Sequence, residues 1–282
     1  GELLRLYSEG GEDPAKIFES HKRQAQARRD LTDLIPPEQI VSRDDITSEL
    51  LSSAGLVIAF GGDNHFQHVS HFINDDTPIL GINSDPLTSH GALLQGSASE
   101  IAQVVRAFSQ GEYLLEPWTR LTLTVDGIPY PQATADIFFG EEKRVLMSRY
   151  TLEHLRRNGD GELVPLMPQV EQKCSGLLVA TGAGSSGWFR TAARGTKEYA
   201  EVFAPCAVQA RYAATEISPT ITSEHPEMFF GELHHGDVLR LVSLNRSNGI
   251  ASIDSLITAP FARGQVAELR LSQKPLLVAR SK

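Results

Sequence analysis

A short run of glycine, carboxylate, amide and imidazole groups is the part of this 282-residue sequence best suited to chemistry. It reads GGDNH over residues 61–65 and follows the apolar run Leu56–Phe60. Such a run, ended by glycine, is typical of a buried parallel strand, and ligands of open α/β sheets bind where these strands end. Adjacent glycines let a phosphate-bearing ligand approach the backbone. The Asp63 carboxylate would repel phosphate, so it is better suited to hold a metal or accept a proton.

Taken alone, this pattern is also typical of an ordinary surface turn after a strand. A second apolar strand is expected at residues 77–82, and it ends in the polar turn NSDP at residues 83–86. Two successive strand ends with small polar side chains predict one shared crevice, with Asn83 beside the glycine turn. A helix expected over residues 64–74 would direct its N-terminus at the same place, which favours anions.

Histidines recur at intervals of three along this expected helix, as His65, His68 and His71. That spacing drifts around a helix by about 60° per step, so the rings cannot converge on one metal as a zinc site requires. We therefore expect histidines that are solvated or line a pocket, and no metal held by the protein itself.

A second unit of strand, glycine turn and helix is expected later in the chain. The apolar run CSGLLVAT at residues 174–181 leads into the turn GAGSSG at residues 182–187, and a short helix is expected at residues 188–193. Unlike the first unit, this one lies within a β-rich stretch of sequence.

Helical and strand patterns alternate over the first ~110 residues, which indicates a parallel sheet. Helices are expected at about residues 13–34, 46–53, 64–74 and 97–109, and Leu3–Tyr7 is the candidate for an additional first strand, with Ile40-Val41 as another short strand. From Tyr113 the pattern changes to short β segments, expected at residues 120–125, 133–139, 144–152, 174–181, 207–216, 226–230, 238–244, 250–254, 267–271 and 276–278. The predicted fold class is a Rossmann-like α/β N-terminal domain followed by a β-rich, β-sandwich-like C-terminal domain.

Composition excludes several function classes. The net charge of −9 disfavours non-specific binding to nucleic acid or to an anionic membrane. No apolar run approaches the ~18 residues of a membrane span, and no signal-peptide pattern is visible. Cys174 and Cys206 match no zinc or redox spacing, so we expect buried thiols in a reducing cytoplasm.

The order and spacing of these motifs resemble the NAD kinase family. The family's Gly-Gly-Asp-Gly motif is matched by GGDN at residues 61–64, and its Asn-Glu or Asn-Asp pair on a strand falls at Ala135-Asp136. Its Thr/Gly/Ser-rich turn ending in an aromatic residue is matched by TGAGSSGW at residues 181–188. The segment GINSDP, with Gly91, looks like the branch related to mitochondrial NAD kinase. The resemblance covers roughly residues 46–280.

This resemblance implies an α/β domain at residues 1–112 plus 265–282 and a β-rich domain at residues 113–264. It also implies ATP-dependent phosphorylation of the adenosine-ribose 2′-hydroxyl of NAD, giving NADP, with Asp63 as the general base. Mg²⁺ would be carried by the phosphates rather than by protein ligands. The family assembles as homodimers or homotetramers, so a homo-oligomer is expected.

Further site residues follow from the same resemblance. Those expected beside the phosphates are Gly61, Gly62, Asn64, His65 and Asn83. Those expected to bind NAD are Asp136, Gly184, Ser185, Ser186, Gly187, Trp188 and Thr191.

Several residues depart from the family's pattern. Asn64 replaces a glycine, His65 a threonine and Ala135 an asparagine, while Ser175 stands where many members have an aspartate. Each lost hydrogen bond to a ligand costs about 1–3 kcal/mol. These departures leave open a degenerate homologue that binds a nucleotide with altered or lost kinase activity. A kinase of another hydroxyl, on a lipid or a sugar, is a further alternative. The acidic charge and the absence of an exposed amphipathic stretch disfavour a membrane lipid.

Overall fold

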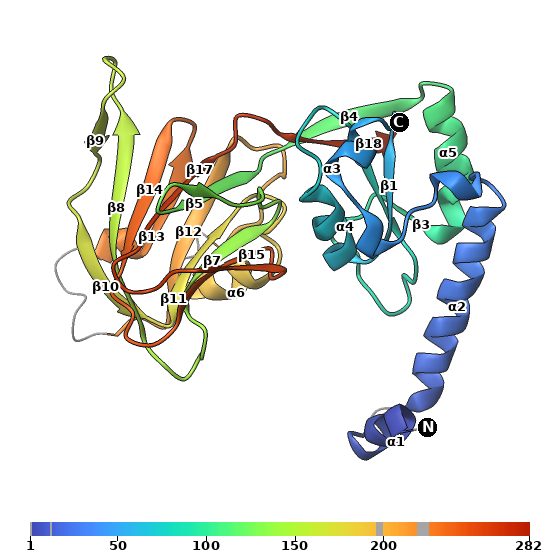
Figure 1. Cartoon of the computed structure of the whole chain (residues 1–282), viewed down its shortest axis with the longest axis horizontal. Coiled ribbons are helices and arrows are strands. Elements are labelled where there is room, and N and C mark those ends of the chain that lie inside the picture. Colours follow the sequence, from blue (N-terminus) through green and yellow to red (C-terminus); the bar gives the residue numbers. More distant parts are fainter. Residues whose placement is uncertain (1, 12, 196–199, 219–225) are drawn as a thin grey trace. The chain divides into compact units, whose positions relative to one another are not determined.

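The structure, a computed structural model, describes residues 2–11, 13–195, 200–218 and 226–282 (Figure 1). The chain divides into two compact units. The α/β unit comprises Gly1–Val69, Thr77–Leu115 and Val278–Lys282, and the β-rich unit comprises Ser70–Asp76 and Glu116–Leu277.

A parallel sheet forms the centre of the α/β unit, as the alternating pattern predicts. Its order is β1-β2-β18-β4, with β3 paired to β2, and β1, β3 and β18 all run parallel to β2. The register places Gly61 opposite Asn83, so the turns that follow β1 and β2 begin at the same edge of the sheet. The strands are β1 (Val57–Gly61), β2 (Ile79–Asn83), β3 (Gly96–Ser97), β4 (Tyr113–Trp118) and β18 (Leu276–Ser281).

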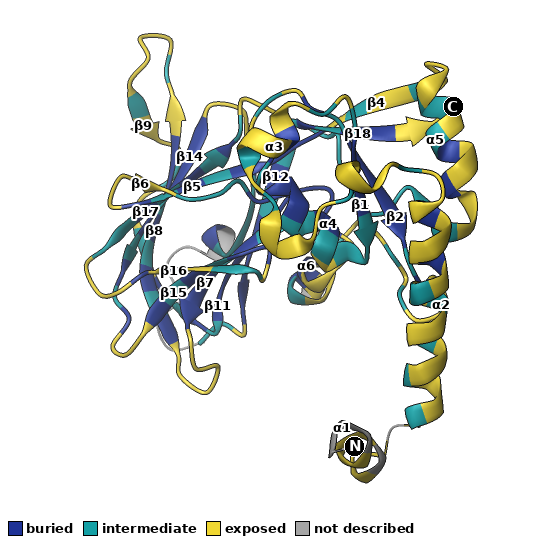
Figure 2. Cartoon of the chain, turned by 45° about the vertical axis from the view of Figure 1, so that its right-hand side comes forward, coloured by how far each residue is buried: buried dark blue, intermediate teal, exposed yellow. Residues whose placement is uncertain are grey.

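Helices of this unit begin and end at residues whose types favour those ends. The Asp13 carboxylate accepts the N–H of Ala15 at 2.9 Å, and Pro14 occupies the first turn of the following helix. Figure 2 shows this long helix mostly exposed, with Ala27 and Leu31 as its buried residues. The α-helices are α1 (Glu2–Glu9), α2 (Pro14–Thr32), α3 (Ser48–Ser52), α4 (Asp63–Ser70) and α5 (Ile101–Ser109); short 3-10 helices lie at Pro37–Gln39, Arg43–Asp45 and Ala98–Glu100.

The predictions of two short strands near the N-terminus are wrong. Residues 3–7 lie in α1, because Leu3, Leu6 and Tyr7 recur at the spacing of one helical face. Ile40 and Val41 lie in irregular backbone after a 3-10 helix. Within the described residues, the sheet of the α/β unit therefore contains no strand that precedes β1 in the sequence.

Two antiparallel sheets enclose one core in the β-rich unit, which confirms the predicted sandwich-like domain. Their orders are β10-β8-β14-β17-β5-β6, with β9 on β8, and β13-β12-β11-β7-β15-β16. Leu123 and Tyr150 from one sheet pack with Phe139 and Val179 from the other, and Figure 2 shows these strands largely buried. The strands are β5 (Leu121–Val125), β6 (Ile128–Pro129), β7 (Asp136–Glu141), β8 (Ser148–Arg157), β9 (Leu163–Pro165), β10 (Val170–Cys174), β11 (Gly176–Ala180), β12 (Gln209–Thr215), β13 (Phe230–His234), β14 (Asp237–Ser243), β15 (Gly249–Ile253), β16 (Ile257–Pro260) and β17 (Val266–Leu271).

The apolar run at residues 174–181 is not one strand. It breaks at Ser175, and Gly176 takes a φ of 149°, which favours glycine. As a result β10 joins one sheet and β11 joins the other. A Cβ on Gly176 would lie 2.2 Å from the Phe138 ring, so the crossing also needs a residue without a side chain.

The chain was expected to return to the α/β unit at residue 265, but it returns later in the sequence. Strand β17 pairs with β5 and β14 inside the β-rich unit. The chain re-enters the α/β unit only at Val278, within β18. None of the described helices is long and apolar enough to cross a bilayer. Cys174 is buried and Cys206 is half-buried, and both thiols are free.

A buried arginine holds the segment at residues 70–76 within the β-rich unit. Arg120 is 2 % exposed, and its guanidinium donates to the carbonyl oxygens of Ile73 at 2.7 Å, Ser70 at 2.9 Å and Gln132 at 3.1 Å. Burial lowers the pKa of Arg120 to about 10, against the raising effect of the Asp254 carboxylate. The side chain therefore remains cationic at neutral pH while it satisfies carbonyls from separate segments.

Replacing this arginine tests how far the contacts of residues 70–76 contribute to stability. Arg120→Lys keeps the charge but loses the planar set of donors, so buried carbonyls lose their partners. We expect the free energy of unfolding to fall by about 2–4 kcal/mol, measured by denaturant titration. Arg106→Lys on the exposed surface of α5 is the control, with a change within about 0.5 kcal/mol. Equal stability of the two variants would contradict this account.

Candidate functional site

The two glycines after β1 have different roles. A Cβ on Gly61 would lie 2.9 Å from the Cβ of His65, so Gly61 is needed because His65 packs against its backbone. A Cβ on Gly62 would make only an ordinary contact, with the Ser89 hydroxyl at 3.7 Å. The backbone of Gly62 is therefore less crowded than that of Gly61.

Asp63 is the first residue of α4 and its carboxylate is fixed by backbone groups. Oδ1 accepts the N–H of Leu93 at 2.8 Å, and Oδ2 accepts the N–H of Ala92 at 3.0 Å. A carboxylate oxygen can accept more than one hydrogen bond, so both oxygens retain acceptor capacity. Asp63 is thus held in one orientation and can still accept a proton from a hydroxyl group.

Asn83 shapes the neighbouring turn rather than standing free. Its amide donates to the Ser89 carbonyl at 3.0 Å, and its Oδ1 accepts the N–H of Asp85 at 3.1 Å. The Arg23 guanidinium then binds both oxygens of the Asp85 carboxylate, at 2.8 and 3.0 Å, and holds the pKa of that carboxyl well below its usual range. This chain of contacts ties α2 to the turn that follows β2.

The two residues after Asp63 are bound by an arginine that the sequence pattern does not single out. The Arg43 guanidinium donates to Asn64 Oδ1 at 3.4 Å and to His65 Nδ1 at 3.5 Å. The carbonyl of Arg43 accepts from His68 Nε2 at 3.4 Å. Burial lowers the pKa of His65, and the charges of Arg43 and His68 lower it further. Arg43 comes from a 3-10 turn with no periodicity, so no local signal could have found it.

The three histidines have different partners. The rings of His65 and His68 lie stacked with centroids 6.4 Å apart, in the neighbourhood of Arg43. His71 is buried in the β-rich unit, and its Nε2 donates to Asp254 Oδ2 at 2.8 Å. In the part of the chain that the structure describes, no group of three or more His, Cys, Asp or Glu side chains could hold a metal ion.

The second and third family-like motifs lie against one another in the β-rich unit. Strand β11 pairs with β7 so that Ala180 is opposite Asp136. Thr181 then donates its N–H to the Ala135 carbonyl at 2.9 Å and its hydroxyl to the Thr134 carbonyl at 2.6 Å. A Cβ on Gly184 would lie 2.3 Å from the Ala135 carbonyl oxygen. Position 184 therefore needs a glycine, because its backbone packs closely against that of Ala135. Asp136 and the turn at residues 184–188 therefore form one candidate binding surface.

Side chains of this turn differ in how they face solvent. Ser185 is buried, and its hydroxyl donates to the Gly182 carbonyl at 2.7 Å and accepts the N–H of Phe203 at 3.2 Å. The exposed members of the candidate set are Ser186, Gly187, Trp188 and Thr191. Trp188 opens the helix α6 (Trp188–Ala192), where its ring lies 5.1 Å from the Phe138 ring and 5.3 Å from the Arg144 guanidinium.

A buried carboxylate fixes the backbone around Asp136. Asp254 accepts the N–H groups of Thr134, Ala135 and Asp136 at 2.8, 2.8 and 3.0 Å, in addition to the His71 ring. Burial raises the pKa of Asp136 to about 7, with a further contribution from the Asp254 charge. The Asp136 carboxyl has no recorded hydrogen-bond partner among the described residues. Near neutral pH it can therefore either donate or accept a hydrogen bond to a ligand.

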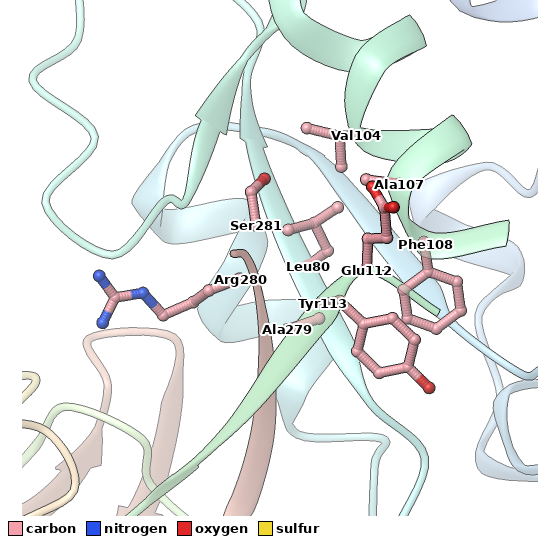
Figure 3. A pocket seen from close by; sticks show the side chains of 9 residues that line it. All are labelled: Leu80, Val104, Ala107, Phe108, Glu112, Tyr113, Ala279, Arg280 and Ser281. Carbon is pink, nitrogen blue, oxygen red and sulfur yellow. The ribbon is translucent and has the colours of Figure 1, made fainter. Parts of the chain in front are cut away.

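The α/β unit also contains a small apolar pocket (Figure 3). Leu80, Val104, Ala107 and Phe108 line it, and the figure shows the Arg280 side chain pointing out of it. None of its lining residues belongs to the candidate site, so we assign it no part in the chemistry.

Titration of Asp136 tests the electrostatics of this surface. Because its folded-state pKa is raised, Asp136 contributes stability at low pH that is lost as pH rises from about 4 to about 7. Asp136→Asn should therefore gain about 2 kcal/mol relative to the wild type between about pH 5 and about pH 8. Carbon NMR of the Asp136 carboxyl should show a midpoint near 7. Asp160→Asn in an exposed loop is the control, and an ordinary midpoint near 4 for Asp136 would contradict the account.

No protein-family model matches the chain. The chain is 31% identical over 162 residues to the probable NADH kinase of Oryza sativa subsp. japonica, covering 52% of this chain and 48% of that protein. It is 28% identical over 180 residues to the NADH kinase of Arabidopsis thaliana, covering 54% of this chain and 51% of that protein. The chain thus spans about half the length of the curated relatives it matches.

Solved structures share the fold. An NAD kinase from Archaeoglobus fulgidus in complex with ATP matches with a TM-score of 0.60 and 18% identity, over 84% of this chain and 80% of that chain. Yeast NADH kinase complexed with NADH matches with a TM-score of 0.66 and 15% identity, over 86% and 65%. At such identities the likeness shows the fold. The chain therefore has the fold of these NAD kinases, and over about half of its length its sequence is similar to relatives named NADH kinases.

Proposed function

We propose that the chain transfers the terminal phosphoryl group of ATP to the adenosine-ribose 2′-hydroxyl of a nicotinamide adenine dinucleotide, with NADH as the preferred acceptor. The observation that carries this proposal is Asp63, which follows Gly62 and whose carboxylate is fixed by two backbone N–H groups. The choice of NADH rests on the curated relatives, which are named NADH kinases, and on a structural neighbour solved with NADH.

Asp63 would act as the general base. A ribose hydroxyl is a poor nucleophile until its proton is removed, and a positioned carboxylate can remove it. The hydroxyl oxygen then forms a bond to the terminal phosphorus, the bond from that phosphorus to the bridging oxygen breaks, and ADP leaves. The proton ends on Asp63 and is later lost to solvent. Phosphoryl transfer needs mainly alignment and charge stabilisation, so few protein groups have to take part in the chemistry.

Donor phosphates would lie at the first turn of α4. The N–H groups of His65 and Phe66 bond the Gly62 carbonyl at 2.9 and 3.1 Å, whereas those of Asp63 and Asn64 have no acceptor among the described residues. These two N–H groups at the start of the helix could bind a phosphate. Both oxygens of Asp63 are already hydrogen-bonded, whereas Mg²⁺ in kinase sites usually takes few protein ligands and several phosphate oxygens. We therefore propose Mg²⁺ bound mainly through the donor phosphates, where it would neutralise their charge.

The dinucleotide would bind at the surface formed by Asp136 and residues 184–191. Exposed Ser186 and Thr191 offer hydroxyl groups, and Gly187 leaves its backbone accessible. A carboxyl group that titrates near pH 7 can bond to a ribose hydroxyl or to a carboxamide. Trp188 is backed by Phe138, so its indole would present a fixed aromatic face. We also propose, from the family resemblance alone, that the protein is a cytoplasmic homodimer or homotetramer.

A nucleotide-binding homologue without turnover is the second candidate. It is favoured by the exposed Asn64 side chain, which stands at the glycine turn and is held there by Arg43. Such a protein would be stabilised by NADH or NADPH through linkage and would form no product.

Replacing the proposed base separates these two candidates. Asp63→Asn keeps the shape of the side chain, so we expect kcat for NADPH formation from NADH, ATP and Mg²⁺ to fall by about 10²–10⁴-fold. The KM values should change little, because the base acts in the transition state.

The control is Asp76→Asn, an exposed carboxylate without a recorded partner among the described residues. Its kcat should equal that of the wild type. If Asp63→Asn turned over as fast as the control, Asp63 would not be the base. If the folded wild type bound NADH but formed no NADPH, the second candidate would replace the first.

A further inference from the structure

We propose that Arg43 binds the phosphate chain of the phosphoryl donor and replaces, with a cationic side chain, the glycine contact that Asn64 removes from the first motif. This inference rests on the proposed function, because it assigns a donor-binding residue to the same site. The chemical class it recognises is a phosphoanhydride chain, such as that of ATP or of inorganic polyphosphate.

The guanidinium of Arg43 lacks a carboxylate counter-ion among the described residues. Arg23, by contrast, binds Asp85 through paired hydrogen bonds at 2.8 and 3.0 Å. The recorded partners of the Arg43 guanidinium are the neutral Asn64 and His65, at 3.4 and 3.5 Å. Because those contacts are long and a guanidinium carries several donors, most of its hydrogen-bonding capacity remains unused. An exposed cation in this state is suited to an incoming anion.

The positions of the ring protons on His65 and His68 add hydrogen-bond donors to those of Arg43. Arg43 can only donate, so Nδ1 of His65 must be the acceptor and its ring proton lies on Nε2. His68 donates through Nε2 to the Arg43 carbonyl at 3.4 Å. The ring proton of His65 therefore lies on Nε2, on the side of the ring that faces away from the guanidinium, and it has no acceptor among the described residues. The lowered pKa of His65 favours the neutral ring, which does not repel the guanidinium. The N–H groups of Asp63 and Asn64 at the start of α4, which have no acceptor among the described residues, add further donors.

Asn64 and His65 orient the arginine instead of blocking the turn. A glycine and a threonine at these positions would offer backbone access but no acceptors aligned for the guanidinium. Here the amide oxygen of Asn64 and the imidazole nitrogen of His65, two and three residues after Gly62, accept from the Arg43 guanidinium. A guanidinium binds phosphate through two parallel hydrogen bonds, which adds charge that a glycine backbone lacks. The Asp63 carboxylate stays directed at Ala92 and Leu93 and so does not compete for Arg43.

Ligand binding to the full chain tests this inference without requiring turnover. Calorimetry would compare Mg-ATP, inorganic tripolyphosphate with Mg²⁺, and adenosine as the probe without phosphate. For Arg43→Ala we expect the Kd of both phosphate probes to rise by about tenfold or more, the effect of losing hydrogen bonds to a charged group. Arg43→Lys should restore part of the binding, because it keeps the charge but not the paired geometry.

Arg106→Ala removes the same charge from an exposed position on α5 and is the matched control. It should bind all probes as the wild type does. In turnover assays Arg43→Ala should raise the KM for ATP and leave the KM for NADH unchanged. A binding loss for ATP without one for tripolyphosphate would show that the nucleoside is recognised, and would overturn the inference.

Equal binding of Mg-ATP by Arg43→Ala and Arg106→Ala would also overturn it, as would a folded wild type that binds neither phosphate probe. If the wild type binds both probes through Arg43 and forms no NADPH, the proposed kinase function fails while the inference stands. Circular dichroism of every variant confirms that the exposed substitutions leave the fold unchanged.

Discussion

The Asp254 carboxylate organises the part of the β-rich unit on which the proposed acceptor surface depends. Its side chain is fully buried, and it accepts hydrogen bonds from three successive backbone N–H groups and from His71. A buried carboxylate is costly unless its oxygens are satisfied, and here each oxygen has two donors. The contact fixes the start of β7, and so the orientation in which Asp136 leaves the backbone. Its negative charge also helps to keep Asp136 in a state between acid and carboxylate near neutral pH.

In the α/β unit, too, backbone N–H groups fix a carboxylate, though fewer of them take part. Asp63 is held by the N–H groups of Ala92 and Leu93, which belong to a loop after β2 rather than to α4 itself. Asn83 and Asp85 hold the preceding part of that loop. The carboxylate proposed as the base is therefore positioned by a turn that the parallel sheet places beside it, and the register of β1 and β2 is what makes this possible. Pre-positioning of this kind is what a phosphoryl transfer asks of its protein.

Local sequence patterns predict the elements whose formation has a local cause. Asp13-Pro14 starts α2, the apolar run before Gly61 becomes β1, and Asp126-Gly127 turns between β5 and β6. The two-unit fold follows from the change of periodicity near Tyr113. What could not be predicted depends on distant partners. The run at residues 174–181 divides because its halves belong to different sheets.

The same reason explains the unpredicted members of the candidate site. His71 and Asp254 are 183 residues apart and meet only when the sheets have formed. Arg43 lies 21 residues before Asn64 in a turn without periodicity. From the sequence, Asn64 and His65 look like losses from a family motif, because their acceptor role depends on an arginine that no local pattern connects to them. The candidate base could be located from its neighbours in the sequence, whereas its surroundings could not.

The central claim is that this chain places a phosphoryl group on the ribose of a dinucleotide. ³¹P NMR of a reaction containing the full chain, NADH, ATP and Mg²⁺ tests it most directly, because the spectrum reports the position of the new phosphate. The account predicts a new phosphomonoester at the ribose 2′-position and an equal amount of ADP. Unchanged NADH and ATP, in the presence of folded protein that binds both, would contradict it.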